Sequence, residues 1–158
     1  MVEKTGFIKP KRDYAVFVIV TCMGGGIPLV IEKGNFQKKM WKLPGGRPAP
    51  EDKGDKEVTA MREVDDEIGI VVECPEKEIL IIPKAKHDFI VLEAKYFSGE
   101  IIAKAEIERV EQFNFAQIRQ MITQGNILYG HANALLKYIV EEEESVRRFL
   151  KRVEKLVI

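Results

Sequence analysis

The chain has 158 residues, of which 46% are hydrophobic and 32% are charged, a composition typical of a folded globular protein. Its 25 basic and 25 acidic residues balance, so the formal net charge is zero and a nucleic-acid partner is not expected. The two cysteines and two histidines lack zinc-ligand spacing. No apolar run reaches membrane-spanning length, and the first 14 residues lack the apolar core of a signal peptide. We therefore expect a cytoplasmic protein without a membrane partner.

The first third of the chain predicts short strands separated by glycine-rich turns. A continuous apolar and β-branched run at 14–22 is typical of a buried strand. Three glycines at 24–26 fit a hairpin turn, and 27–31 is then the returning strand. The following segments are a short strand at 40–43, a stop to regular structure at Pro44-Gly45-Gly46, and a loop at 47–55.

A helix is predicted over residues 56–68. Asp55 is a plausible N-cap, and Gly69 stands where a glycine commonly ends a helix. The apolar residues recur on one face of this helix, at Val58, Met61, Val64 and Ile68. This face is expected to pack into the core.

The second half of the chain predicts further strands and ends in helices. The strand-like runs are at 70–72, 79–83, 89–97 and 110–115, followed by a short helix at 116–123 and a helix from about 131 to the end. Strands mixed with helices predict an α/β (α+β) fold in one domain, 1–158, with 131–158 as a C-terminal helical extension. The apolar stripe of that extension is compatible with a monomer or a homodimer.

Three carboxylates, Glu63, Asp66 and Glu67, share an arc of roughly 100° on the helix over 56–68. Carboxylate oxygens are natural ligands of a hard divalent ion such as Mg²⁺ or Mn²⁺. Considered alone, a solvated acidic face is the better interpretation of these residues. The segment upstream of the helix changes that balance.

Leu43-Pro44-Gly45-Gly46 precedes this helix, and Arg62 to Ile70 reads R-E-V-D-D-E-I-G-I. Together these segments resemble the Nudix box, G-x5-E-x7-R-E-U-x-E-E-x-G-U, with U a bulky aliphatic residue and Asp66 replacing the first Glu of the pair. Fifteen residues separate Gly46 from Arg62, two more than the pattern allows. The isolated Glu of the pattern is therefore assigned to Asp55, with Glu51 as the alternative.

The resemblance implies a Nudix-type α/β/α sandwich with a mixed sheet. It also implies Mg²⁺-dependent hydrolysis, with Mn²⁺ as a possible substitute, of a phosphoanhydride bond in a nucleoside diphosphate linked to another group. The implied metal ligands are Glu63, Asp66, Glu67 and the Gly45 carbonyl. Glu63 and Glu67 would be catalytic together with Arg62, whose expected role is to orient the acids by ion pairing.

Further site residues follow from the same resemblance. Gly46, Arg47 and Lys42 are expected to bind substrate phosphates, although a solvated loop surface is the alternative for the two basic residues. The general base is Glu63 or an acid outside the box, Glu106 or Glu108, for which surface charge is an equally good interpretation.

The small-molecule nucleotide substrate is left open by the sequence. A MutT-like enzyme for nucleoside triphosphates is the first hypothesis, and a nucleotide-sugar or ADP-ribose pyrophosphatase is the close alternative. A hypothesis of another class is a Nudix-fold module that senses a nucleotide without cutting it. The three retained acids favour the enzyme.

Overall fold

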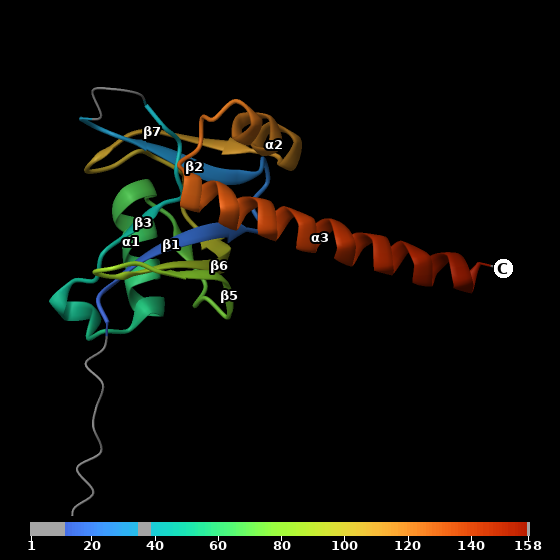
Figure 1. Ribbon diagram of the computed structural model, residues 1–158, viewed down its shortest axis with the longest axis horizontal. Coiled ribbons are helices and arrows are strands. Elements are labelled where there is room, and N and C mark those ends of the chain that lie inside the picture. Colours follow the sequence, from blue (N-terminus) through green and yellow to red (C-terminus); the bar gives the residue numbers. More distant parts are fainter. Residues whose placement is uncertain (1–11, 35–38, 158) are drawn as a thin grey trace, which may run out of the picture.

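The computed structural model describes residues 12–34 and 39–157. Its strands are β1 (Tyr14–Thr21), β2 (Ile27–Glu32), β3 (Gly45–Gly46), β4 (Val71–Val72), β5 (Lys77–Pro83), β6 (Asp88–Ser98) and β7 (Ile107–Phe113). Its α-helices are α1 (Lys56–Ile68), α2 (Phe115–Thr123) and α3 (Tyr129–Leu156), with a 3-10 turn at Pro50–Asp52. Figure 1 shows how these elements are arranged.

The larger sheet is mixed, as the sequence predicted. It has five strands in the order β3-β1-β6-β4, and β5 pairs with β6. β1 runs parallel to β6, whereas β3, β4 and β5 are antiparallel to their neighbours. β2 and β7 form a separate two-stranded antiparallel sheet. This α+β architecture confirms the predicted fold class.

The predicted hairpin between the first two strands is wrong. Both strands exist, but β1 pairs with β3 and β6, while β2 pairs with β7. The chain leaves the larger sheet through Cys22, which has a positive φ of 61°, and then enters the smaller sheet. A glycine-rich turn permits a change of direction, but it does not determine which strand the returning segment pairs with.

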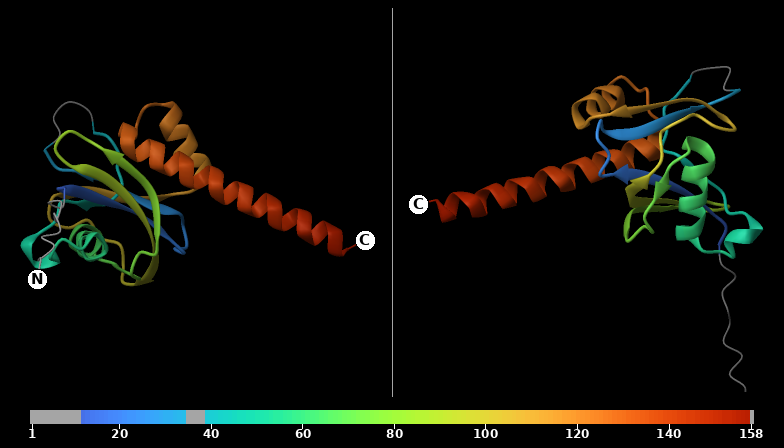
Figure 2. Two further views of the ribbon diagram at one scale, coloured as in Figure 1. Left: turned by 60° about the horizontal axis from the view of Figure 1, so that its bottom comes forward. Right: turned by 180° about the vertical axis from the view of Figure 1, so that it is seen from behind.

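The two faces of β1 are both buried, which explains its uninterrupted apolar sequence. Val16 and Val18 belong to a core layer shared with α1, including Ala60. Phe17 belongs to the opposite layer, where the first turns of α3 pack against both sheets. Figure 2 shows α1 and α3 on opposite sides of the larger sheet.

Helix α1 has the predicted bounds and the predicted caps. Asp55 accepts hydrogen bonds from the backbone N–H groups of Glu57 and Val58, and Gly69 ends the helix with a φ of 74°. The predicted apolar face is partly wrong, because Val58 is exposed. The most buried residues are instead Ala60, Val64, Glu67 and Ile68, with Thr59 beside them.

Helix α3 begins two residues before the predicted start and is 28 residues long. Its first turns are buried, and its remainder projects away from the sheets (Figure 1). Within the described residues, no helix combines the length and the apolar character that a membrane crossing needs.

Candidate active site

Glu67 is the most deeply buried acid of α1, with 7% of its surface exposed. Its Oε2 accepts a hydrogen bond from the backbone N–H of Gly45 at 3.2 Å. Burial raises the pKa of Glu67 to about 8, opposed by the nearby Lys42 ammonium and by the Gly45 N–H. The helix and the Pro-Gly-Gly turn are therefore joined directly through a predicted site residue.

The turn that carries Gly45 is itself part of the larger sheet. The sequence predicted a stop to regular structure here, but Gly45 and Gly46 form β3 and pair with Phe17 and Val16. Gly45 has a φ of +146°, and a Cβ at this position would lie 2.1 Å from the Val16 carbonyl oxygen. Only glycine lets the backbone approach β1 this closely.

The strand predicted at 40–43 is reduced to isolated bridges, one from Lys42 to Val30 and one from Trp41 to Ile127. The start of α3 holds this segment in place. Leu43 donates its backbone N–H to Nδ1 of His131 at 3.1 Å. His131 is 5% exposed, and its neutral ring therefore supports the turn from within the core.

Arg62 organises the other acids of α1. One of its guanidinium nitrogens lies 3.3 Å from Glu63 Oε1 and 3.3 Å from Asp66 Oδ2. Burial raises the pKa of Glu63, opposed by Arg62 and assisted by the neighbouring acids Asp66 and Glu106. Asp66 is the most exposed of the three predicted metal ligands, with 58% of its side chain accessible.

Asp52, which the sequence analysis missed, is the acid that supports Arg62. It accepts two hydrogen bonds from the guanidinium, at 2.9 and 2.8 Å, and its side chain is 1% exposed. It also accepts from the backbone of Ala49 and from the Thr59 hydroxyl. The pKa of Asp52 lies well below its usual range, mainly because of the hydrogen bonds from Arg62. Burial opposes this lowering of the pKa.

This finding corrects the assignment of the isolated acid of the box. Asp55 caps α1 instead, and Glu51 is exposed. A usable signal was present in the sequence, because five residues separate Gly46 from Asp52, the G-x5-E spacing with Asp in place of Glu. The two extra residues therefore fall between Asp52 and Arg62.

The acids of α1 face an open cavity of about 320 Å³. It is lined by Arg62, Glu63, Asp66, Glu67, Lys104, Ala105 and Glu106. Of the two candidate bases outside the box, Glu106 lies at this cavity, whereas Glu108 forms an ion pair with Lys39. Lys104 is a cavity residue that no sequence motif indicated.

The side chains of the two predicted phosphate-binding basic residues, Lys42 and Arg47, lie in different places. Lys42 is buried beside Glu67, forms an ion pair with Glu32 and lies 5.2 Å from the centre of the Phe17 ring. The Arg47 guanidinium points elsewhere, to Asp13 at 3.1 Å and His87 at 3.3 Å.

The Arg47 backbone and Gly46 contribute to the site through their positions next to Arg62 and Glu63. The Arg47 carbonyl accepts a hydrogen bond from Arg62 at 3.2 Å. The α-carbon of Gly46 faces the Glu63 carboxyl group, which a Cβ there would approach to 2.9 Å.

The donor chemistry of this site fits a hard divalent cation. Its carboxylates are the oxygen ligands that Mg²⁺ prefers, and Mg²⁺ usually retains several waters, so one or two carboxylates suffice. In the described part of the chain, no three acid, histidine or cysteine side chains are already gathered closely enough to hold an ion. The Arg62 guanidinium supplies the positive charge between Glu63 and Asp66 in this arrangement.

Several solved structures share this fold. A NUDIX hydrolase from Nitrosomonas europaea is 18% identical with a TM-score of 0.66, covering 83% of this chain and 90% of that chain. A MutT structure described for Aliivibrio salmonicida and Vibrio cholerae is 20% identical with a TM-score of 0.58, covering 70% and 86%. An ADP-ribose pyrophosphatase from Streptococcus suis is 17% identical with a TM-score of 0.59, covering 80% and 90%.

No curated protein matches the chain in sequence. The NUDIX domain model, in contrast, matches residues 11–133, a range that contains the turn, Asp52, α1 and the cavity. The chain therefore belongs to the Nudix hydrolase family, whose members hydrolyse derivatives of nucleoside diphosphates.

Proposed function

We propose that this chain is a Mg²⁺-dependent pyrophosphohydrolase whose preferred substrates are nucleoside triphosphates. The observation that carries the proposal is the cavity at α1, where three acids of the box meet Arg62 and Lys104. A triphosphate presents dense negative charge, and a mixed wall of cations and metal-binding carboxylates suits that charge.

The acids of the cavity, Arg62 and the neighbouring Gly45 have distinct roles in the proposal. Glu63, Asp66, Glu67 and the Gly45 carbonyl would hold Mg²⁺, which when bound neutralises phosphate charge and lowers the pKa of the attacking water. Arg62 keeps Glu63 and Asp66 in place because Asp52 fixes its own position. The Gly45 N–H orients Glu67 through its 3.2 Å hydrogen bond.

Glu106 is proposed as the general base that accepts the proton of the attacking water. It lies at the cavity beside the acids of α1, without belonging to the box. Glu106→Gln is then expected to lower kcat by about 10²–10⁴-fold with little change in KM. Glu108→Gln is the matched control, because Glu108 pairs with Lys39 instead. Equal kcat values in the two variants would leave Glu63 as the base.

The size of the cavity supports the triphosphate over a larger substrate. Ligand sites commonly span about 300–1,000 Å³, and the 320 Å³ measured here is at the low end of that range. The polyphosphate of a nucleoside triphosphate fits this volume, beside the carboxylates and Lys104 that line it.

The test is product analysis with Mg²⁺ on nucleoside triphosphates, nucleotide sugars, ADP-ribose and dinucleoside polyphosphates. The proposal predicts the highest kcat/KM for a triphosphate, with a nucleoside monophosphate and pyrophosphate as products. A preference for ADP-ribose or a nucleotide sugar would overturn the substrate while leaving the hydrolase intact. Nucleotide binding with no turnover of any compound would overturn the enzymatic proposal.

A further inference from the structure

The second half of α3 has no partner within the described chain. The contacts of α3 with the rest of the molecule extend as far as Glu143, which forms an ion pair with Arg119 of α2 at 2.6 Å. From Glu143 to Val157 every residue is exposed. An isolated helix of this length is marginal in water, and helices usually depend on packing an apolar face.

An apolar stripe runs along this exposed segment. Its members follow one another at spacings of three and four residues, and their exposed fractions are 56% for Val146, 64% for Phe149, 37% for Val153 and 84% for Leu156. Alternating spacings of three and four residues are typical of the seam of a pair of packed helices. The same stripe continues toward the N-terminus of α3 as Leu135 and Ile139, which are fully buried.

We infer that a second copy of this chain covers the stripe, with the two α3 helices antiparallel. The paired region, from Glu142 to Val153, is about 17 Å long at 1.5 Å per residue. Phe149 and Val146 of each copy lie at the centre of the pair, across a two-fold axis. Such an interface uses the same surface on both subunits, as a closed dimer requires.

Charge selects the antiparallel orientation. The acids 141–144 precede the basic residues of the helix, which are Arg147, Arg148, Lys151, Arg152 and Lys155. A parallel pair would place acid beside acid and base beside base. An antiparallel pair centred near Phe149 and Val146 places the acidic block of one copy beside the basic block of the other.

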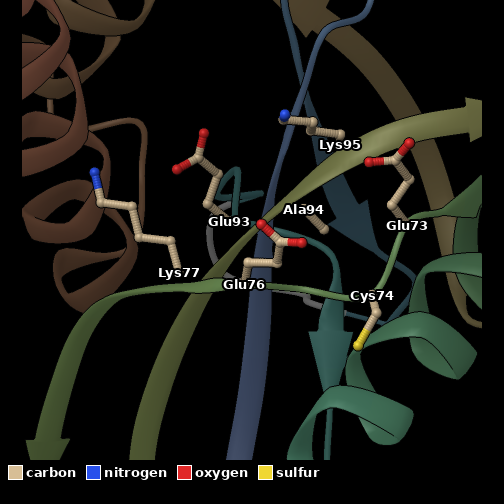
Figure 3. A pocket seen from close by; sticks show the side chains of 7 residues that line it. All are labelled: Glu73, Cys74, Glu76, Lys77, Glu93, Ala94 and Lys95. Atoms are coloured by element: carbon tan, nitrogen blue, oxygen red, sulfur yellow. The ribbon is translucent and has the colours of Figure 1, made fainter.

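The base of the projecting helix adds to this complementarity. Glu142 lies on the stripe between Ile139 and Val146, and it acts electrostatically on Glu93 of β6, which also faces Lys77. Glu93 lines a hollow with the acids Glu73 and Glu76 and with the lysines Lys77 and Lys95, so acids outnumber lysines there (Figure 3). In the antiparallel pair, the basic end of the partner's helix arrives at this side of the molecule.

The shape of the molecule agrees with the same orientation. α3 extends well beyond the sheets, so an antiparallel pair keeps the two sheet-containing bodies at opposite ends of the helix pair (Figure 1). A parallel pair would bring both bodies to the same end of the helix pair. The occupant is therefore a second copy in one defined orientation.

Sedimentation equilibrium of the full-length protein over a concentration series tests the proposal. The wild type is expected to form a dimer, and Phe149→Asp to weaken it by more than about tenfold. Phe97→Asp is the matched control, because Phe97 is also exposed, at 67%, but lies on β6. Circular dichroism verifies that each variant keeps its helix content.

A charge exchange tests the orientation. Glu142→Lys and Arg152→Glu should each weaken the dimer, and the double variant should restore it, because the two positions of different copies lie side by side only in the antiparallel pair. If the double variant dimerises no better than the single variants, the antiparallel orientation is wrong. A wild type that remains monomeric throughout would overturn the proposal, and its binding to anionic lipid vesicles would assign the stripe to a membrane surface instead.

Discussion

At the residue scale, the position of Arg62 depends on Asp52. Asp52→Asn removes a charge that is 1% exposed and leaves the guanidinium, 24% exposed, without its main partner. Loss of one member of a buried pair costs about 3 kcal/mol or more in the free energy of unfolding. We expect Asp52→Asn to lose that much stability in urea unfolding and to lose activity with it.

Asp55→Asn is the matched control for this prediction. Asn is as good an N-cap as Asp, so α1 keeps its cap and stability should change by less than about 0.5 kcal/mol. If Asp55→Asn proved the more damaging variant, the assignment of the supporting acid to Asp52 would be wrong.

His131 predicts a loss of stability in mild acid. Burial, with the nearby Lys42 and Lys84 charges, lowers the pKa of His131 to about 3, whereas an unfolded histidine titrates near about 6.5. Below about pH 6.5, His131 binds a proton in the unfolded chain but not in the folded chain. Stability from this group is therefore complete above about pH 6.5 and falls as pH decreases, by up to about 1.4 kcal/mol per unit.

The check for His131 is urea unfolding of the wild type and of His131→Asn between about pH 7.5 and pH 5, a range set by the histidine pKa. Asn Oδ1 still offers an acceptor to the Leu43 N–H but does not titrate. The wild type should lose stability relative to the variant as pH falls. Parallel pH profiles would show that His131 takes up its proton equally in the folded and unfolded chains, which would contradict the lowered pKa.

At the element scale, the sequence predicts elements better than their partners. α1 was predicted with its bounds and caps because periodicity, Asp55 and Gly69 are all local signals. The partner of β2 was mispredicted because strand pairing depends on residues far away, here β7. β3 was missed because two glycines carry no strand propensity, and only their approach to β1 makes them a strand.

The same limit applies to the candidate site. Glu63, Asp66 and Glu67 were predicted as site residues because they share one helix face and match the Nudix box, and the structure brings them to one cavity. Lys104 reaches that cavity from a segment distant in sequence, and it could not be predicted. Arg47 could not be excluded either, because the direction of its side chain depends on Asp13.

Substitutions at the two glycines of β3 are expected to affect stability and catalysis differently. Gly46→Ala should leave stability within about 1 kcal/mol, since the atoms nearest to its Cβ would be those at the flexible end of Glu63. The displaced carboxyl group should lower kcat by about 10²-fold, the cost of misplacing a catalytic group by about 1 Å. Urea unfolding and steady-state kinetics measure the two effects.

Gly45→Ala is the contrasting variant, because its Cβ would overlap the Val16 carbonyl oxygen at 2.1 Å. It should lose stability and activity together, as the contact between β3 and β1 opens. Equal stability losses in the two variants would contradict the separate roles given to these glycines.

At the scale of the whole molecule, the two faces of the larger sheet have different roles in the structure. The layer under α1 positions the carboxylates of the cavity, and the opposite layer buries the first turns of α3. His131 connects the two tasks, because it stands on α3 and holds the segment that leads to Gly45. The balanced charge indicated only that no broad basic surface was to be expected.

The central claim is that the acids of α1 carry out metal-dependent hydrolysis of a nucleotide phosphoanhydride. The most direct measurement is kcat/KM over a Mg²⁺ series for the wild type, Glu67→Gln and Asp65→Asn. Asp65 is the matched control, since it is an exposed acid of the same helix outside the cavity. The account predicts Mg²⁺-dependent turnover in the wild type and Asp65→Asn, and a loss of at least about 10²-fold in Glu67→Gln. Turnover that is equal in all three proteins, or independent of Mg²⁺, would contradict it.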